Sequence, residues 1–335
     1  MRSGHHLVSH DATEHGRAVV TSVVPPKGAR DGQLIDGGSL LVRLANFVKL
    51  PHTVFAMPFA LVGVIFASVQ HSISGVTIGW VLLAFTAARF AAMGFNRIVD
   101  RDVDAVNPRT VMRELPRGAL TIGQAKASVI AASMIFLFAS WKLNPLCLLL
   151  SPVALVWVLG YSYTKRFTRW SHLWLGLGLS IAPVGGYLAI TGAWSDPWWL
   201  LCVLALVVVT WSGGFDILYA LQDADFDRAN GLHSIPSAIG VPNAIRWSRA
   251  LHVMSVVCLA TVVASHPLGA VSANAQGLLW LGVLGVAGML VFEHRMVKAD
   301  DLSKLNAAFF TMNGLISVGF LAVVLVARLS AGFAP

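Results

Sequence analysis

The amino-acid sequence predicts an all-α fold, a polytopic membrane bundle of about nine transmembrane helices. Of the 335 residues, 56% are hydrophobic and only 12% are charged, which leaves too few polar side chains to cover a water-soluble globule. A membrane-spanning helix needs about 20 mostly apolar residues. Candidate spans of that kind recur along the chain, at residues 47–69, 76–96, 124–141, 146–163, 173–191, 198–218, 247–265, 276–293 and 307–327.

The two ends of the chain differ in composition from this bundle. Residues 1–42 carry Gly, Ser, His and charged residues without a sustained apolar run, which predicts a flexible cytoplasmic leader rather than a folded domain or a signal peptide. One transmembrane domain is expected over residues 43–328, followed by a short tail at 329–335. The three cysteines lie in separate spans and show no CxxC spacing, so the sequence supports neither a disulfide framework nor a zinc site.

Basic residues predict the orientation of the bundle, because Lys and Arg near helix ends collect on the cytoplasmic side of a membrane. With the N-terminus inside, the outward loops and tail contain only Lys142 and Arg328. The inward loops contain Arg97, Arg101, Arg109, Arg113, Arg117, Lys165, Arg166, Arg169, Arg228, Arg246, Arg249, Arg295, Lys298 and Lys304. We therefore expect a multi-pass protein of the inner (cytoplasmic) membrane. The net charge of +8 then needs no nucleic-acid partner, since this bias and an attraction to anionic lipid explain most of it.

Two polar arrays follow the second and the sixth candidate span, on the side expected to face the cytoplasm. They are Asn96, Asp100 and Asp104 in the first array, and Tyr219, Asp223 and Asp227 in the second. Residues four apart lie on one face of a helix, about 6 Å from each other, so each array forms a single stripe. Carboxylate and amide oxygens suit Mg²⁺, which usually binds through one or two carboxylates plus phosphate oxygens. One such stripe could merely solvate a helix end, whereas two on the same membrane side favour a shared metal site.

These motifs carry a resemblance to a known family. The segments NRIVDRDVDAVNPRTVMRELPRG (residues 96–118) and GFDILYALQDADFDRANGLHS (residues 214–234) resemble the two signature regions of the UbiA superfamily of intramembrane aromatic prenyltransferases. The resemblance extends to the entry segment at 47–52 and to the loop at 161–166, and so covers residues 43–328. It implies a reaction in which two Mg²⁺ ions hold the diphosphate of a polyprenyl donor. Departure of that diphosphate leaves an allylic cation, which an electron-rich aromatic ring attacks.

The resemblance also assigns roles to the acidic residues. It implies that the metal ligands are Asn96, Asp100, Asp104, Asp223 and Asp227. The four aspartates and Tyr219 are the expected catalytic residues, although Tyr219 could instead anchor its helix at the headgroup level.

Basic residues of two segments are candidates for binding the diphosphate. Lys165 and Arg166 resemble the basic pair of the family, and arginine suits bidentate contact with phosphate oxygens, although the predicted topology alone would also place them there. The loop that carries Arg109, Arg113 and Arg117 could close over the site as a lid or lie along lipid headgroups. Arg113 is the preferred donor from this loop.

Three further residues are expected to bind substrate. Arg89 lies inside the second span, seven residues before Asn96 and on nearly the same face, where a buried charge is costly and usually functional or paired. It could hold an acceptor carboxylate or an aspartate of the motif. Asp216 lies two turns before Asp223 and could touch the acceptor or the metal. Lys49 resembles a basic position of the family near the polar end of the substrate cavity, and interfacial snorkelling is the alternative.

The resemblance is strongest to the 4-hydroxybenzoate polyprenyltransferase branch, which acts in respiratory quinone (ubiquinone or menaquinone) synthesis. The expected partners are a polyprenyl diphosphate, an aromatic acid and the lipid bilayer, and a dihydroxynaphthoate is the alternative acceptor. His233 stands where many relatives have Lys, which removes a fixed charge near pH 7.

Two other classes of protein remain alternatives. A secondary transporter would place its polar site near the membrane midplane rather than at span ends. A CDP-alcohol phosphatidyltransferase would carry one continuous aspartate motif rather than two.

Overall fold

The computed structural model describes residues 35–50, 56–269, 272–299, 301–302, 305 and 308–331. Most of the predicted leader and the end of the tail lie outside these residues. The long elements are helices α1 (Leu40–Phe47), α2 (Met57–Ala67), α3 (Gly75–Val99), α5 (Ile122–Leu143), α6 (Pro145–Thr164), α7 (Ser171–Thr191), α8 (Trp199–Ala220), α11 (Val241–Ala264), α12 (Ala273–Met296) and α14 (Asn313–Ser330). The short ones are α4 (Arg101–Val106), the 3₁₀ turn η2 (Leu221–Asp223), α9 (Ala224–Ala229), α10 (Ile235–Ile239) and the π-helix η3 (Ala308–Met312).

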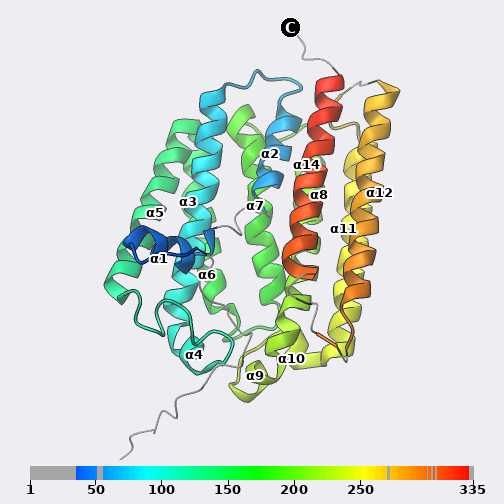
Figure 1. The fold of residues 1–335 in the computed structure, drawn as a ribbon. Helices are drawn as coiled ribbons and strands as arrows, with labels where there is room; N and C mark the ends of the chain where they lie inside the picture. Colours follow the sequence, from blue (N-terminus) through cyan, green and yellow to red (C-terminus); the bar gives the residue numbers. More distant parts are fainter. Residues whose placement is uncertain are drawn as a thin grey trace, which may run out of the picture.

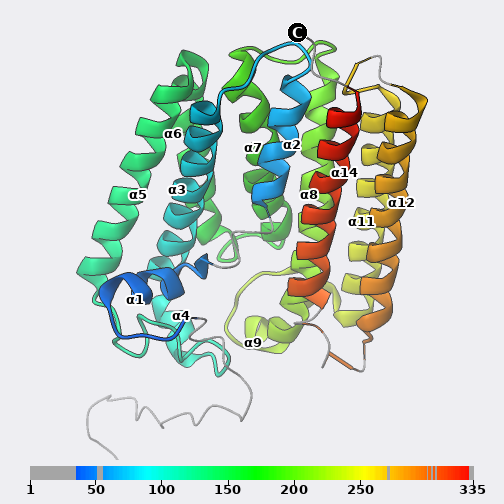
Figure 2. The ribbon, with the colours of Figure 1, turned by 45° about the horizontal axis from the view of Figure 1, so that its top comes forward.

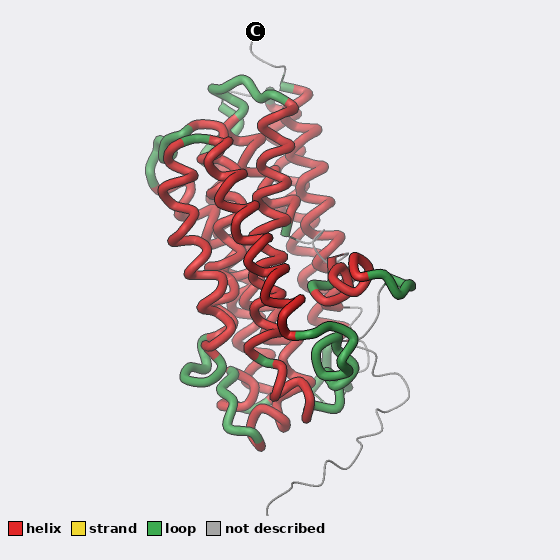
Figure 3. Tube along the Cα trace, turned by 90° about the vertical axis from the view of Figure 1, so that its left-hand side faces the viewer, coloured by secondary structure: helices red, strands yellow, loops and turns green. Residues whose placement is uncertain are grey.

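The predicted all-α membrane fold is confirmed. Eight of the described helices are long and apolar enough to cross a membrane: α3, α5, α6, α7, α8, α11, α12 and α14. They run side by side along the length of the molecule, with the loops gathered at its two ends (Figures 1 and 3). These eight approach the predicted number of about nine spans, and the shorter apolar helix α2 lies within the remaining predicted span.

The first predicted span, residues 47–69, takes a different form from the others. Helix α1 ends at Phe47 and lies across α3 and α5 (Figure 1), and α2 begins only at Met57. The 11 residues of α2 rise about 16 Å, roughly half the thickness of a bilayer core. A proline explains where this helix begins, because Pro58 in its first turn has no N–H to satisfy and a backbone angle already suited to a helix.

Glycines allow α2 to pack closely against α7. A methyl group on Gly63 would collide with the carbonyl of Pro183, and one on Gly186 would collide with the carbonyl of Ala60. Small residues at such contacts let two helix backbones approach, which increases their van der Waals contact inside a membrane. This pairing places α2 in the middle of the bundle, between α7 and α14 (Figure 2).

Aromatic side chains fill the core of the bundle around Trp211 of α8. The ring of Trp211 lies 4.9 Å from that of Phe59 and 5.0 Å from that of Phe215, and its side chain is fully buried. Edge-on and tilted contacts at these distances are the arrangements that aromatic rings prefer. The core thus connects α2 to α8, whose far end leads into the second acidic motif.

One end of the bundle carries the polar elements, and we call it the polar end. Helices α4, α9 and α10 all lie there (Figures 1 and 2). The loop between α4 and α5 lies at the same end, and α5 then begins with a capping box in which Thr121 and Gln124 bind each other's backbone N–H groups. The two acidic motifs, more than 100 residues apart in sequence, are therefore brought to the same end of the molecule.

Candidate functional site

Each acidic motif crosses a break between a long helix and a short one. Asp100 ends α3 and begins α4, and Asp223 ends η2 and begins α9, both with ψ near zero. The helical periodicity continues through the first break, because the Asp100 N–H donates to the Asn96 carbonyl (2.8 Å) and the Asp104 N–H donates to the Asp100 carbonyl (2.7 Å). Asp104 and Asp227 lie in the first turns of the short helices. Both stripes therefore face the same polar region.

The loop that follows α4 joins the two motifs. Arg109 donates from Nη2 to Asp223 Oδ2 (2.6 Å) and from Nε to Asp223 Oδ1 (2.9 Å). Its Nη1 also donates to the hydroxyl of Tyr219 (3.3 Å), and Asn107 Nδ2 donates to Asp223 Oδ1 (3.4 Å). The loop thus folds over the site, as one of the two sequence hypotheses expects, rather than along lipid headgroups.

Every aspartate of the two stripes is paired with a basic side chain. The pairs are Asp100 with Arg166 (3.0 Å), Asp104 with Arg113 (2.6 Å), Asp223 with Arg109 (2.6 Å) and Asp227 with Lys165 (3.3 Å). The structure therefore brings together the acidic residues and the basic residues that the sequence singled out. It also adds Arg109, which the sequence ranked below Arg113.

The charged groups of this site are largely removed from water. Asp104, Asp223 and Asp227 are 5%, 7% and 2% exposed. Burial raises the pKa of the Asp100 carboxyl, against the opposing effect of the Arg166 charge. Burial pulls the pKa of Arg109 down, but the Asp223 carboxylate and the other negative groups outweigh it, so the pKa of Arg109 lies above its usual value. Arg109 therefore keeps its positive charge.

Lys49 lies between α1 and α2 and belongs to the same charged group. Its side chain is buried, and its backbone has a φ of 48°, which is rare for a residue other than glycine. Burial lowers the pKa of Lys49 to about 6, and the charges of Arg97 and Arg113 act in the same direction. A lysine with this pKa is mostly neutral at pH 7, and an anion bound beside it would favour its charged form.

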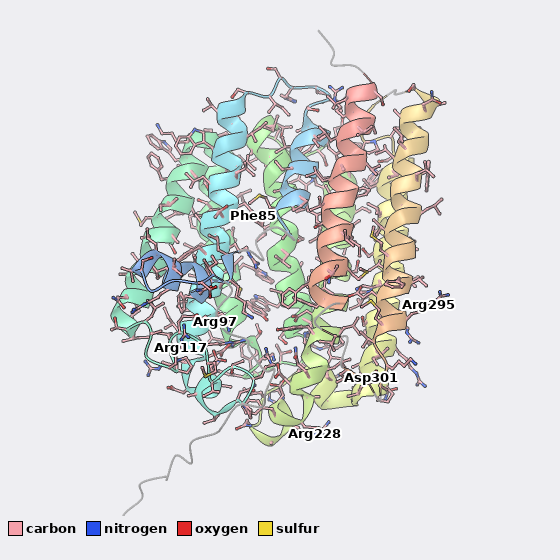
Figure 4. The ribbon with its side chains drawn as sticks, viewed as in Figure 1. Phe85, Arg97, Arg117, Arg228, Arg295 and Asp301 are labelled. Atoms are coloured by element: carbon pink, nitrogen blue, oxygen red, sulfur yellow. The ribbon has the colours of Figure 1, made fainter. Side chains whose placement is uncertain are left out.

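An apolar cavity of about 530 Å³ opens beside the first motif. It is lined by residues of α2, α3, α5, α6 and α7, and its few polar groups include Arg89 and Asn96 on α3. Phe85, another lining residue, lies further along α3 from the polar end than Arg97 (Figure 4). Because Asn96 also belongs to the first stripe, the cavity and the charged site meet at this residue. The predicted orientation of Arg89 toward the substrate region agrees with its place in this wall.

Two oxygens fit the requirements of a divalent cation. Asp104 Oδ2 is buried without a hydrogen-bond partner among the described residues. Asn96 donates from Nδ2 to Asp100 Oδ2 (2.8 Å), so its amide oxygen is not used in that hydrogen bond. Among the same residues no three His, Cys, Asp or Glu side chains form a ready metal cluster.

Asp216 is held by a histidine that the sequence did not reveal. His172 of α7 is fully buried, and its Nδ1 lies 2.6 Å from Asp216 Oδ2. Its other ring nitrogen, Nε2, accepts a hydrogen bond from the backbone N–H of Ile235 (3.4 Å). An Nε2 that accepts must be unprotonated, so Nδ1 carries the proton and donates it to Asp216. Helices α7, α8 and α10 are thereby tied together beside the second motif.

Comparison with known proteins assigns the fold to a family. Residues 56–315 match the UbiA prenyltransferase family. This chain belongs to that family. It is an enzyme, a membrane-embedded UbiA prenyltransferase, and the family, enzyme class and multi-pass membrane character predicted from the sequence are confirmed.

Named relatives and solved structures agree with this assignment. Over 251 residues, this UbiA prenyltransferase is 27% identical to the 4-hydroxybenzoate octaprenyltransferase of Aliivibrio fischeri, covering 73% of this chain and 83% of the relative. It is 28% identical over 256 residues to the enzyme of the same name from Paraburkholderia phytofirmans, covering 76% and 83%.

Among solved structures, the apo UbiA homologue from Aeropyrum pernix K1 superposes with a TM-score of 0.74 at 29% identity, covering 83% of this chain and 98% of that one. A UbiA homologue from Archaeoglobus fulgidus bound to GPP and Mg²⁺ has a TM-score of 0.66 at 20% identity, covering 86% and 99%. At that identity the second likeness shows the shared fold.

Some site residues of this UbiA prenyltransferase escaped the sequence analysis. His172, Asn107 and Arg97 were not selected, yet His172 binds Asp216, Asn107 binds Asp223, and Arg97 Nη1 lies 4.0 Å from Asp104 Oδ2. For Asn107 and Arg97 a signal existed, because both lie inside the first signature segment. His172 gave none, since it stands alone at the start of an apolar helix. His233 contributes through its backbone, whose N–H donates to the carbonyl of Lys165 (2.7 Å).

Proposed function

We propose that this chain transfers a polyprenyl group from a polyprenyl diphosphate to an aromatic acid, with 4-hydroxybenzoate as the acceptor, in respiratory quinone synthesis. The observation that carries the proposal is the junction of two different environments at Asn96, a charged site on one side and an apolar cavity on the other. A polyprenyl diphosphate has the matching chemistry, with an anionic head and an apolar tail. The similarity to 4-hydroxybenzoate octaprenyltransferases supports the choice of acceptor.

The two stripes are the proposed sites for two Mg²⁺ ions. Asn96, Asp100 and Asp104 would hold one ion, and Asp223 and Asp227 the other. When bound, the ions neutralise the diphosphate and stabilise the negative charge that grows on it as it leaves. This role explains why four carboxylates are gathered at one end of the bundle despite the cost of burying them.

The basic residues are proposed to exchange partners when substrate binds. Arg109, Arg113, Lys165 and Arg166 now neutralise the aspartates. Once the aspartates bind metal, the same cations are free to donate to diphosphate oxygens nearby. Arg109 already presents Nη2 and Nε to two oxygens of one anion, which is the two-point geometry that a phosphate also accepts. The resting ion pairs thus keep the donors in place before substrate arrives.

The cavity is the proposed site of the isoprenoid chain and of the reaction with the acceptor. Its apolar wall excludes water, which would otherwise capture the allylic cation. Arg89 is the proposed partner of the acceptor carboxylate, because it supplies a cation within that wall. The electron pair of the C–O bond leaves with the diphosphate, the ring carbon of the acceptor bonds to the allylic carbon, and the ring then loses a proton.

The proposed orientation puts the polar end in the cytoplasm, where soluble aromatic acids are available, and the proposed location is the inner membrane. The basic residues that the sequence places in inward loops support it, since Arg109, Arg113 and Lys165 all lie in this site. The outward-assigned Arg328 adds to the argument, because it is buried in α14 and bonded to Ser68 rather than exposed as a loop charge.

Prenyl transfer in isolated membranes tests the proposal. A long polyprenyl diphosphate is supplied with labelled 4-hydroxybenzoate or with a labelled dihydroxynaphthoate, in the presence of Mg²⁺ or of a chelator. We expect a lipid-soluble labelled product from 4-hydroxybenzoate that depends on Mg²⁺. Product from the naphthoate alone would place the enzyme in the menaquinone pathway, and product that forms equally well with chelator would contradict the metal assignment.

A further inference from the structure

A second basic site lies at the polar end, on the outer side of α11 and α12. A surface hollow of about 570 Å³ there is lined by the basic residues Arg246, Arg249, His294, Arg295 and Lys298. None of its lining residues belongs to the two acidic stripes or to the apolar cavity. Figure 4 shows Arg295 at the lower end of α12, on the opposite side of the bundle from Arg97 and Arg117. We call this hollow the α11–α12 pocket.

The ends of two neighbouring helices bring these charges together. Arg246 and Arg249 lie one turn apart near the start of α11, while Arg295 lies in the last turn of α12 and Lys298 just beyond it. All four side chains are exposed. Like charges gathered in one hollow repel each other, so an anion placed among them would be bound favourably.

No carboxylate neutralises these four residues among those that the structure describes, in contrast to the aspartate-paired cations of the diphosphate site. Glu293 is adjacent in sequence, but it is 1% exposed and its Oε2 faces inward, 3.8 Å from His252 Nδ1. Arg246 donates to a neutral amide oxygen, that of Asn243 (3.2 Å). Asp301 is paired with Lys298 through backbone hydrogen bonds, at the edge of the pocket. The pocket therefore carries an excess of positive charge.

Exposed apolar side chains continue from the pocket along both helices. On α11, Val253 and Val257 follow Arg249 at four-residue spacing and are 64% and 54% exposed. On α12, Val291 stands four residues before Arg295 and Leu284 seven residues before that, and they are 53% and 66% exposed. Each stripe thus runs from a cation at the polar end to apolar side chains in the spanning part of the helix.

Trp247 marks the level of the pocket relative to the membrane. Its ring is 45% exposed and packs edge-on against Trp170 at 5.7 Å between centroids. Tryptophans of this kind gather where the hydrocarbon core meets the headgroups. The position of Trp247 therefore favours a headgroup-level place for the basic residues, with the apolar stripes beside the acyl chains.

We propose that the α11–α12 pocket binds the phosphate headgroup of an anionic membrane phospholipid, whose acyl chains lie along the two apolar stripes. Charge complementarity selects the anionic headgroup, and the apolar stripes select a lipid over a soluble phosphate. Basic pockets between transmembrane helices on the cytoplasmic side are known to bind such headgroups. The bound lipid would hold α11 and α12 together beside the core that supports α8.

Lipid retention by the purified full chain tests this proposal. The protein in mild detergent is titrated with phosphatidylglycerol or phosphatidylcholine, and bound lipid is counted by native mass spectrometry. We expect specific retention of phosphatidylglycerol, and about a 30-fold weaker apparent affinity in the double variant Arg249→Gln/Arg295→Gln. The matched control, Lys126→Gln/Lys142→Gln, removes two exposed cations elsewhere and should leave retention unchanged.

Three outcomes would overturn the proposal. Equal retention of the two lipids, or equal loss in the control variant, would show that only general surface charge is involved. Displacement of phosphatidylglycerol by millimolar inorganic phosphate alone would indicate a soluble anion as the ligand. The charge-preserving variant Arg249→Lys/Arg295→Lys guards against misfolding, because it should retain the lipid if charge is the cause.

Discussion

Arg109 and Asp223 form a two-point ion pair between the two acidic regions, although 114 residues separate them in sequence. The pair fixes the loop after α4 against the second motif. The same guanidinium lies over the ring of Tyr219, 5.5 Å from its centroid, so three groups of the proposed site are held by one side chain.

Prenyl transfer is predicted to depend on the planar geometry of the Arg109 guanidinium as well as on its charge. Replacing it with Lys keeps the charge and loses the two-point contact, and we expect kcat/KM for the polyprenyl diphosphate to fall about 100-fold. Steady-state prenyl transfer measures this. Arg117→Lys, in the same loop but beside Glu114, is the control and should stay within about twofold. Equal effects of the two substitutions would contradict the role of Arg109.

The two acidic stripes are predicted to be equally necessary for turnover. Asp100→Ala and Asp223→Ala should each reduce turnover about 1,000-fold or more while the protein still inserts into the membrane, because each removes a ligand of the proposed ions. Asp102→Ala and Asp225→Ala provide matched controls, since their side chains are 86% and 98% exposed. Near-normal activity of either ligand variant would refute the two-cluster arrangement.

Lys49 is predicted to make stability depend on pH. Its pKa in the folded protein is about 6 against 10.5 for a free lysine, so between these values the unfolded chain binds one more proton. Stability without metal or substrate should therefore rise with pH across this window, by at most about 1.4 kcal/mol per pH unit, and should level off below pH 6. Thermal unfolding in detergent between pH 6.5 and 8.5 should show a smaller rise for Lys49→Met than for the unaltered protein. An identical slope would show that Lys49 is already charged at pH 7.

His172 is predicted to act through Asp216 as a positioning residue. His172→Gln removes the Nδ1 donor of a fully buried histidine, and we expect kcat to fall about tenfold with less change in the KM for the polyprenyl diphosphate. A double-mutant cycle with Asp216→Asn distinguishes this from general destabilisation. The two losses should not add if His172 works only through Asp216, and full additivity would exclude that role.

Sequence periodicity was sufficient to predict most of the helices and the spacing of the two acidic motifs. A four-residue spacing predicted both stripes, and eight of the nine apolar runs predicted as spans form long helices, because each pattern depends on neighbours within a few turns. The short α2 was harder to predict, since only its packing against Pro183 and Gly186 of α7 explains how a half-length helix is accommodated.

The contacts of His172 and Arg109 depend on tertiary structure. Nothing near His172 in sequence indicates that α7 passes beside Asp216, and nothing in the loop after α4 distinguishes Arg109 from Arg113 as the partner of Asp223. These contacts follow from how α7, α8 and the loop pack. Local pattern identified the chemistry of the candidate site, and packing decided its partners.

The tryptophan pair in the cavity wall provides an internal optical probe. The rings of Trp157 and Trp174 are stacked 4.1 Å apart and 8° from parallel, and each indole N–H donates to the other residue's backbone carbonyl, at 3.3 and 3.1 Å. Chromophores so close and so rigidly held share their electronic transitions, which produces a strong near-ultraviolet circular dichroism signal. Because both rings line the cavity, filling it with a chain should alter that spectrum, so occupancy can be followed without any label.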